Sequence, residues 1–178
     1  TQWVPWRIWA GVAALSALAY VWVAGGHSLA APTVGAAKGD TAADFTLSDP
    51  DGKKVRLHDL KGKVVILSFW ATWCPPCRME MPHLEALAKK YAKKPVKVVG
   101  VNLDVSGAQL KSWMQKNKLG FTVVSDTDGA VANRYRVQSI PTLFLLDQNL
   151  VIQERKEGFD PDMEKNLGAQ IDALLKKK

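Results

Sequence analysis

The chain has 178 residues, of which 47% are hydrophobic and 23% charged, enough for one buried core and one globular domain with an appendage. Its formal charge of +7 comes largely from lysines in short pairs, without interleaved aromatic residues or a nucleic-acid-binding motif. We therefore expect no nucleic-acid partner, and we interpret these lysines as a solvated helix face and a basic tail with weak attraction to anionic lipid.

An uncharged apolar stretch, Ile8–Ala24, lies near the start of the sequence. As a helix it would extend roughly 26 Å, just enough to cross the apolar part of a bilayer with slight thinning or help from flanking residues. Aromatic residues cluster toward both of its ends, as rings do at the two headgroup levels of a membrane. They are Trp3, Trp6 and Trp9 at one end and Tyr20 and Trp22 at the other.

Residues 1–25 are therefore predicted to form one transmembrane helix that serves as a retained membrane anchor. A cleaved signal peptide is the alternative, because Ser28–Ala30 resembles a small-residue processing site. Arg7 places the N-terminus in the cytoplasm and the later residues in the periplasm or another extracytoplasmic space. Residues 26–40 are Gly- and Ala-rich and predict a flexible tether, which leaves 41–178 as the folded domain.

Within that domain, short strand patterns alternate with helical ones. Strands are expected over Phe45–Leu47, Lys54–Leu57, Val64–Trp70, Val96–Val101, Thr122–Val124, Leu143–Leu146 and Val151–Arg155. Helical spacing covers Cys77–Tyr91, Gly107–Lys118, Ala130–Tyr135 and a last helix opened by Pro161. The alternation early in the chain and the hairpin plus helix at its end predict an α/β fold, a three-layer sandwich with a mixed β-sheet.

The two cysteines of the chain, Cys74 and Cys77, enclose only two prolines, and three uses of this dithiol can be compared. A disulfide between them closes too small a loop to stabilise a fold. Zinc needs roughly four ligands, and neither His58 nor His83 has the paired spacing of a zinc site, so no metal ligand is predicted. Copper(I) accepts two thiolates and stays open as a minor alternative.

Redox chemistry explains the setting of the dithiol better. Cys74 falls where a buried strand ends and a helix begins, so the helix N-terminus favours its thiolate, the form that attacks disulfides. Pro75 and Pro76 fit the first helical positions, where an N–H group has no partner within the helix. Cys77, one turn further and more buried, would then attack the mixed disulfide. A proline at the start of a strand ordinarily follows a trans bond, but together with this dithiol the Ile140–Pro141 bond is predicted to be cis.

These features together resemble the thioredoxin superfamily, and within it the membrane-anchored thiol-disulfide oxidoreductases of the TlpA/ResA/CcmG-like group. The likeness covers about Ala43 to Lys178. It rests on FWATWCPPCRMEMP, on Ile140-Pro141-Thr142, on ADFTL from Ala43 and on LHDLKGKVV from Leu57.

The resemblance implies a role for each matching residue. Cys74 would be the nucleophile, Cys77 the resolving cysteine and Pro141 the cis proline beside them. The backbone of Ile140 would pair with an extended substrate segment. The substrate-binding flank would comprise Trp73, Pro75 and Pro76, while Trp70 mainly packs. No cofactor beyond the redox-active disulfide is expected.

The proton acceptor for Cys77 is the point where this sequence departs from cytoplasmic thioredoxins. Those proteins carry a buried aspartate two residues before the motif tryptophan, and this chain has Ser68 there. Asp104, just after the next strand, is one candidate, with a surface turn as its alternative role. Glu80 is the other, since the group often has an acid there, and a first-turn position would favour it.

The expected function is a disulfide reductase tethered to the outer face of the cytoplasmic membrane. The resemblance implies a membrane electron donor of the DsbD/CcdA type and client proteins with disulfides, either apocytochrome c or copper-site cysteines of an oxidase assembly factor. An oxidase or isomerase uses the same residues and stays open, as does a tethered copper(I)-binding module. A peroxidase is less expected, because Ala71 stands where such sites have threonine.

Overall fold

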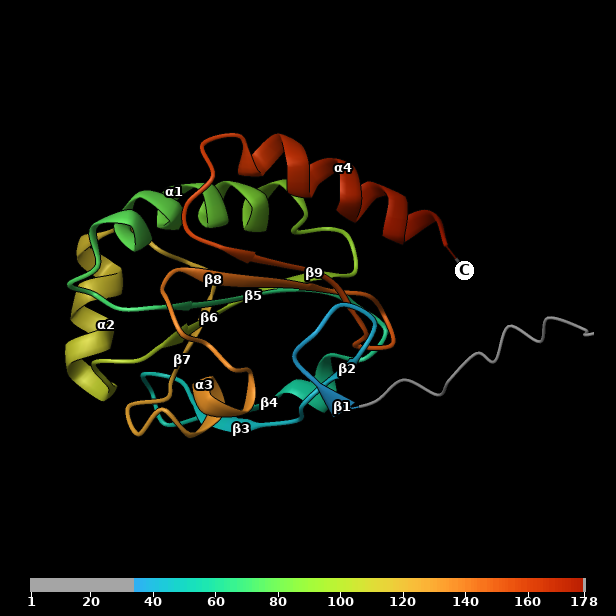
Figure 1. The fold of residues 1–178 in the computed structure, drawn as a ribbon. Coiled ribbons are helices and arrows are strands. Elements are labelled where there is room, and N and C mark those ends of the chain that lie inside the picture. Colours follow the sequence, from blue (N-terminus) through green and yellow to red (C-terminus); the bar gives the residue numbers. More distant parts are fainter. Residues whose placement is uncertain (1–33, 178) are drawn as a thin grey trace, which may run out of the picture. The chain divides into compact units, whose positions relative to one another are not determined.

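A computed structural model of the chain describes residues 34–177 (Figure 1). Its centre is a seven-stranded mixed sheet in the order β4-β3-β7-β6-β5-β8-β9, preceded by a small parallel pair, β1 with β2. The strands are β1 Val34–Gly35, β2 Thr41–Ala42, β3 Thr46–Ser48, β4 Lys54–Arg56, β5 Val64–Trp70, β6 Val96–Asn102, β7 Thr122–Ser125, β8 Thr142–Leu146 and β9 Ile152–Glu157. The helices are η1 Leu57–Leu60, a 3₁₀ turn, then α1 Pro75–Lys90, α2 Gly107–Lys116, α3 Ala130–Arg134 and α4 Met163–Lys176.

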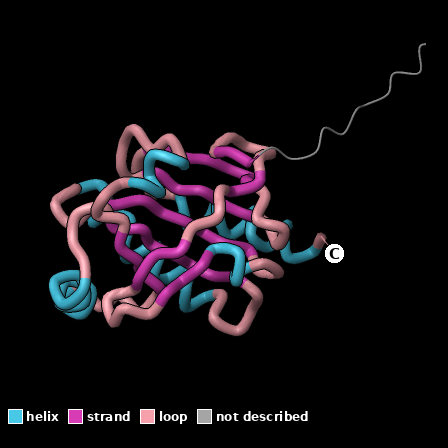
Figure 2. Tube along the Cα trace, turned by 90° about the horizontal axis from the view of Figure 1, so that it is seen from below, coloured by secondary structure: helices cyan, strands magenta, loops and turns pink. Residues whose placement is uncertain are grey.

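The sheet separates two apolar clusters, which gives the three layers that the sequence predicts. The cluster on one face lies under α1 and α4, and the cluster on the other lies against η1 and α3. Strands β5, β6 and β7 are parallel to one another, β8 pairs antiparallel with β5, and β9 pairs antiparallel with β8 at the edge of the sheet. Figure 2 shows the strands crossing the domain, with the connecting loops at their ends. The thioredoxin-like α/β fold with a mixed sheet is confirmed.

Strand β5 is a buried inner strand of the sheet and positions the dithiol. All seven of its residues are buried, as its nearly unbroken apolar sequence predicts for a strand covered on both faces. It is paired along most of its length with β6 on one side and β8 on the other. Because its last residue, Trp70, is followed within a few residues by α1, the carboxyl end of β5 brings the dithiol to one edge of the sheet.

Several element boundaries differ from the sequence prediction. Helix α2 ends at Lys116, because Lys118 has a φ of 55° and so leaves the helical conformation. The strand expected from Val151 begins at Ile152 and continues to Glu157. The last helix begins at Met163, after the turn that contains Pro161.

Residues 34–40 belong to the folded domain, whereas the composition of the sequence favours a tether through residue 40. Strand β1 pairs with β2, and Ala36 is buried. The Asp40 carbonyl accepts a hydrogen bond from Ile152 N–H at 2.9 Å, and Gly39 N–H donates to the Ile152 carbonyl at 2.8 Å. Small residues suit this segment because it lies close against the start of β9.

The predicted membrane span, Ile8–Ala24, and the alternative processing site at Ser28–Ala30 lie outside the described residues. Between residues 34 and 177, no helix combines the length and the apolar character needed to cross a bilayer.

Tyr135 links the second apolar cluster to the start of the domain. Its ring is buried among Phe45, Phe69 and Phe144, and its hydroxyl donates to the Ala43 carbonyl at 2.7 Å. We expect Tyr135→Phe to lower the free energy of unfolding by roughly 1 to 2 kcal/mol, because the Ala43 carbonyl loses its partner in a buried place. Urea unfolding measures this change, and an unchanged midpoint would contradict the assigned bond.

Candidate active site

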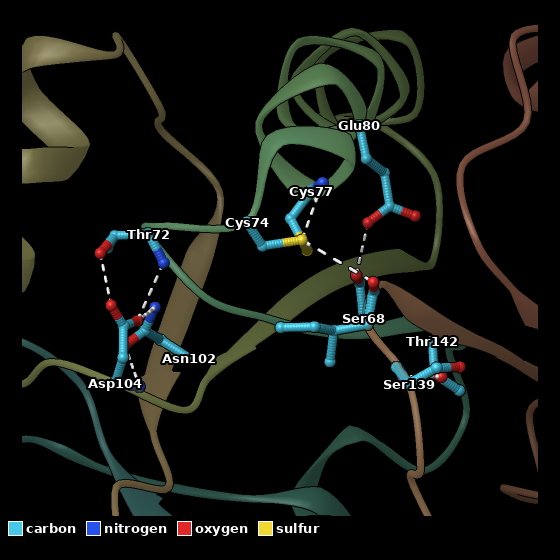
Figure 3. The surroundings of a disulfide bond; sticks show 10 residues. Ser68, Thr72, Cys74, Cys77, Glu80, Asn102, Asp104, Ser139 and Thr142 are labelled. Carbon is cyan, nitrogen blue, oxygen red and sulfur yellow. Dashed lines mark hydrogen bonds between the residues drawn. A yellow bond between two sulfur atoms is a disulfide. The ribbon is translucent and has the colours of Figure 1, made fainter.

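The two cysteines form a disulfide at the start of α1, at the carboxyl edge of the sheet (Figure 3). Their Cα atoms are 5.3 Å apart. Cys74 is the N-cap of the helix, and Pro75 and Pro76 occupy its first positions, as the sequence predicts. The active-site disulfide therefore joins the residue that caps the helix to a residue of its first turn.

The helix provides a donor for the sulfur of Cys74. The Cys77 N–H group lies 3.3 Å from Cys74 Sγ and points toward it. The two prolines have no N–H groups, so in this turn the Cys77 amide supplies the donation that an N-cap side chain usually receives. In the reduced protein the same amide and the positive end of the helix dipole favour the Cys74 thiolate.

The two sulfurs differ in access. Cys74 exposes 3% of its surface and Cys77 none, so only Cys74 is open to an external thiolate. Trp73, exposed at 68%, stands next to it, and Pro75 and Pro76 are also exposed. The expected order of burial is confirmed, although the opening at Cys74 is narrow.

The Ile140–Pro141 peptide bond is cis, as predicted. The Ile140 carbonyl oxygen lies 3.7 Å from Cys74 Sγ. In the disulfide form this is a plain contact, because the sulfur carries no proton, whereas a reduced thiol can donate across it. The Thr142 hydroxyl donates to the Ser139 carbonyl at 2.6 Å and closes the turn around the buried Pro141.

Glu80 is a buried carboxyl group on the same helix as Cys77. It lies three residues further on, so both side chains share one helix face. It is 2% exposed, and Ser68 of β5 donates to its Oε2 at 2.8 Å. Burial raises the pKa of Glu80 to about 7, and the Ser68 hydrogen bond only partly opposes this rise. Figure 3 shows Ser68 and Glu80 next to the disulfide.

The sequence pattern predicts Glu80 in the first turn of α1, but Glu80 lies beyond that turn, and its burial is not predicted by the pattern. It is the sixth residue of α1, and no acidic residue lies in the first turn. A signal was present in Ser68, the polar residue of the otherwise apolar β5. A buried hydroxyl needs a hydrogen-bond partner, and an acid one turn after Cys77 can provide it.

Asp104 holds the loop that leads to Cys74. Its Oδ1 accepts hydrogen bonds from Thr72 N–H at 2.9 Å and Asn102 Nδ2 at 2.8 Å, and its Oδ2 accepts one from the Thr72 hydroxyl. Asn102, fully buried, accepts in turn from the amides of Asp104 and Val105. Both oxygens of this carboxylate are therefore engaged in fixing residue 72.

The Asp104 contacts predict different effects for two substitutions. Asp104→Asn should preserve most of the rate at which Cys77 resolves a mixed disulfide, because the Thr72 hydroxyl can rotate to match the new amide. Asp104→Ala should lower the free energy of unfolding by roughly 1 to 3 kcal/mol, because Thr72 N–H loses its partner. Stopped-flow kinetics and urea unfolding measure the two effects. Equal slowing of resolution in both variants would instead identify Asp104 as the proton acceptor.

Two further side chains near the site have structural contacts. Trp70 is fully buried and its ring lies 4.7 Å from that of Trp113, which confirms a packing role. His83, at the surface of α1, contacts two later parts of the chain. Its Nδ1 lies 2.6 Å from a carboxylate oxygen of Glu164 on α4, and its ring lies 5.4 Å from that of Phe159. Among residues 34–177, no group of three or more His, Cys, Asp and Glu side chains is arranged to hold a metal ion.

Comparison with known proteins agrees with this geometry. The AhpC/TSA family model matches residues 38–155. The thioredoxin-like protein YneN of Bacillus subtilis is 44% identical over 128 residues, which cover 70% of this chain and 74% of that protein. The thiol-disulfide oxidoreductase ResA of Bacillus thuringiensis subsp. konkukian is 40% identical over 119 residues, which cover 66% of this chain and 69% of that protein.

Solved structures show the same likeness. A Chlorobium tepidum protein assigned as the thiol:disulfide interchange protein DsbE has a TM-score of 0.73 and 39% identity, covering 78% of this chain and 98% of that one. StoA from Bacillus subtilis has a TM-score of 0.61 and 31% identity, covering 71% and 95%. With its CxxC disulfide at the start of a helix, the chain belongs to the AhpC/TSA family and is one of its thioredoxin-like thiol-disulfide oxidoreductases.

Proposed function

We propose that the protein is a membrane-tethered, extracytoplasmic disulfide reductase that passes two electrons from its dithiol to disulfides of client proteins. The observation that supports the order of steps is the pairing of a capped, accessible Cys74 with a shielded Cys77 whose helix also bears the buried Glu80. The tether is supported by the uncharged stretch Ile8–Ala24 in the sequence.

The reaction proceeds by two exchanges. The Cys74 thiolate attacks a client disulfide that lies beside Ile140 and Trp73, and one client sulfur leaves and takes up a proton. Cys77 then gives its proton to Glu80 and attacks Cys74 Sγ, which releases the second client sulfur and forms the Cys74–Cys77 disulfide. With a pKa of about 7, Glu80 has nearly equal acid and base forms near neutral pH, which suits proton transfer in both directions.

Family resemblance supplies the partners in this proposal. A membrane electron donor of the DsbD/CcdA type would reduce the disulfide again. Apocytochrome c before haem attachment, or the copper-site cysteines of an oxidase assembly factor, would be the clients. Glu80 is the first choice as proton acceptor for Cys77, ahead of Asp104, because both Asp104 oxygens already accept hydrogen bonds from other groups.

The reduction potential of the dithiol tests the direction of electron flow. Equilibration with glutathione should give a value near that of thioredoxin, about −270 mV. A value near that of DsbA, about −120 mV, would overturn the reductase and favour an oxidase. Copper(I) that stays bound to a Cys74→Ser variant would remove the dithiol from any copper-binding role.

A further inference from the structure

Lysines from three parts of the chain meet at the end of the domain opposite the disulfide. We call this end the basic pole and define it by Lys63, Lys90, Lys93, Lys94, Lys97 and Lys176. Lys63 precedes β5 and Lys97 lies at the start of β6, where the two parallel strands begin side by side. Lys90 ends α1, and Lys176 ends α4.

An ion pair and two hydrogen bonds join these segments into one surface. Lys94 Nζ lies 3.4 Å from a carboxylate oxygen of Asp172 on α4. Gly62 N–H donates to the Gln148 carbonyl at 2.8 Å, and the Gln148 side chain donates to the Leu174 carbonyl at 3.0 Å. The ends of α1 and α4 and the start of β5 therefore lie together, as Figure 1 shows for the end marked C.

The positive charge of the basic pole is largely uncompensated. Within residues 34–177, Lys94 is the one lysine of the six that forms an ion pair. Lys97 is half-buried, and its pKa is lowered first by burial and then by the charges of Lys63 and Lys53. Lys90 and Lys94 flank the ring of Tyr91 at 5.2 and 5.3 Å from its centroid. The fold thus holds cations together that would separate in a free chain.

The surface also has apolar groups among its cations. A hollow between the ends of α1 and α4 is lined by Lys94, Pro95, Asp172, Leu175 and Lys176. Pro95 is exposed and Leu175 half-buried. Cationic side chains around small apolar groups match a phospholipid surface, where phosphate groups lie directly above acyl chains.

The chain also enters the folded domain at this end. Strand β1 pairs with β2, and Thr41 of β2 forms a bridge with Val151, next to the β8–β9 turn that contains Gln148. The described part of the chain therefore begins beside the basic pole, and the uncharged Ile8–Ala24 precedes it in the sequence. Cys74 lies at the other end of α1, whose 16 residues span roughly 24 Å.

We propose that the basic pole binds the anionic phospholipid headgroups of the membrane, so that the disulfide faces away from the bilayer toward clients. This inference rests on the tethering part of the proposed function. Each lysine near the bilayer adds to the electrostatic attraction between the domain and anionic lipid. Dissolved salt screens this attraction. Contact of this kind would fix the orientation of a domain that a single anchor leaves free to turn.

The test uses the full chain reconstituted into vesicles of phosphatidylcholine, with or without about 30 mol% phosphatidylglycerol. A water-soluble amine-acetylating reagent is added, and mass spectrometry gives the rate at each lysine. We expect Lys93 and Lys94 to react at least about fivefold more slowly in the anionic vesicles, while Lys116 and Lys165 keep their rates. About 0.5 M salt should remove the protection.

Matched charge variants make the test specific. Lys63→Gln/Lys93→Gln/Lys176→Gln removes three exposed lysines without an ion pair, and protection of Lys94 should fall to near the level in neutral vesicles. Lys116→Gln/Lys118→Gln/Lys165→Gln loses the same charge outside the basic pole and should leave protection unchanged. Equal rates in both kinds of vesicle, or equal loss in both variants, would overturn the proposal.

Two other readouts separate this proposal from the proposed function. The rate at which the protein reduces a client disulfide in detergent solution should be the same for both triple variants. If no reduction occurs, the proposed reductase function is contradicted but the membrane-binding role of the basic pole is not. Flotation of the chain with pure phosphatidylcholine vesicles reports on the tether. A chain that does not float there but gains protection in the anionic vesicles would contradict the tether and retain the basic pole.

Discussion

Replacement of Cys77 by serine should stop turnover at the mixed disulfide and lower the reductase rate at least about 1,000-fold. Cys74 keeps its helix cap in this variant, because the Cys77 donor is a backbone amide. It still attacks a client, but no second thiol is present to release it. Non-reducing electrophoresis of membranes that contain the variant should show the protein joined covalently to its clients.

Cys74→Ser is the control for this experiment. It should be equally inactive and trap no client, because Cys77 is fully buried and does not reach an external disulfide. Adducts on Cys77 in this variant would contradict the assignment of nucleophile and resolving cysteine. A Cys77→Ser trap that collects abundant secreted proteins without preference would argue against a dedicated client.

Glu80→Gln should slow the resolution step about 100-fold and leave the first attack by Cys74 nearly unchanged. The amide can still accept the Ser68 hydrogen bond, but it takes no proton from Cys77. In the unsubstituted protein, the resolution rate should rise with pH and level off above about 7, where Glu80 is ionised. This inflection should be absent in the variant. Stopped-flow measurement across pH 5 to 9 would detect it, and equal slowing of both steps would contradict the role of Glu80.

The same substitution should stabilise the fold at alkaline pH. The folded pKa of Glu80, about 7, lies above the ordinary value of 4.5. The contribution of neutral Glu80 to the free energy of unfolding is therefore fully present below about pH 4.5 and is lost as the pH rises through about 7. At pH 8, Glu80→Gln should therefore raise the free energy of unfolding by roughly 3 kcal/mol. The gain should shrink toward zero near pH 4.5. Urea unfolding of the oxidised protein at several pH values measures this trend.

Glu164→Gln provides a matched control for both measurements. Glu164 is an exposed acid of α4 that contacts His83. Its replacement removes the same charge without emptying the buried site, and it should change neither the pH inflection of resolution nor the stability at pH 8 by a comparable amount. A similar gain in this variant would attribute the effect to net charge rather than to burial of Glu80.

The parts of the site that local sequence specifies were predictable. The apolar run of β5, the proline pair after Cys74 and the proline before β8 each carry a backbone preference within a few residues. The strand and the start of α1 follow from those preferences, whereas the cis bond was predicted only from the proline and the dithiol together, because a bond before proline is ordinarily trans. The order of attack by Cys74 and Cys77 was inferred from their places on that helix, and the resemblance then favoured redox exchange over copper binding, which spacing alone leaves open.

What could not be predicted depends on contacts between distant residues. Burial of Glu80 requires α1 to lie over β5 with a register that brings it to Ser68. Residues 34–40 look like a tether because of their composition, yet their backbone bonds to Ile152, more than a hundred residues later. Asp104 looks like a turn residue or a base until its contacts with Thr72 are seen. Local patterns do not encode such pairings.

The carbonyl of Ile140, 3.7 Å from Cys74 Sγ, has a consequence for substrate binding. The lone pairs of this oxygen repel a Cys74 thiolate but not a neutral thiol. The carbonyl therefore disfavours the thiolate, whereas the Cys77 amide favours it. A client main-chain N–H that bonds to this oxygen would withdraw electron density from the contact and relieve the repulsion. Docking of an extended client segment would thus increase the fraction of Cys74 present as thiolate. Without a docked client, the enzyme would react more slowly with other disulfides.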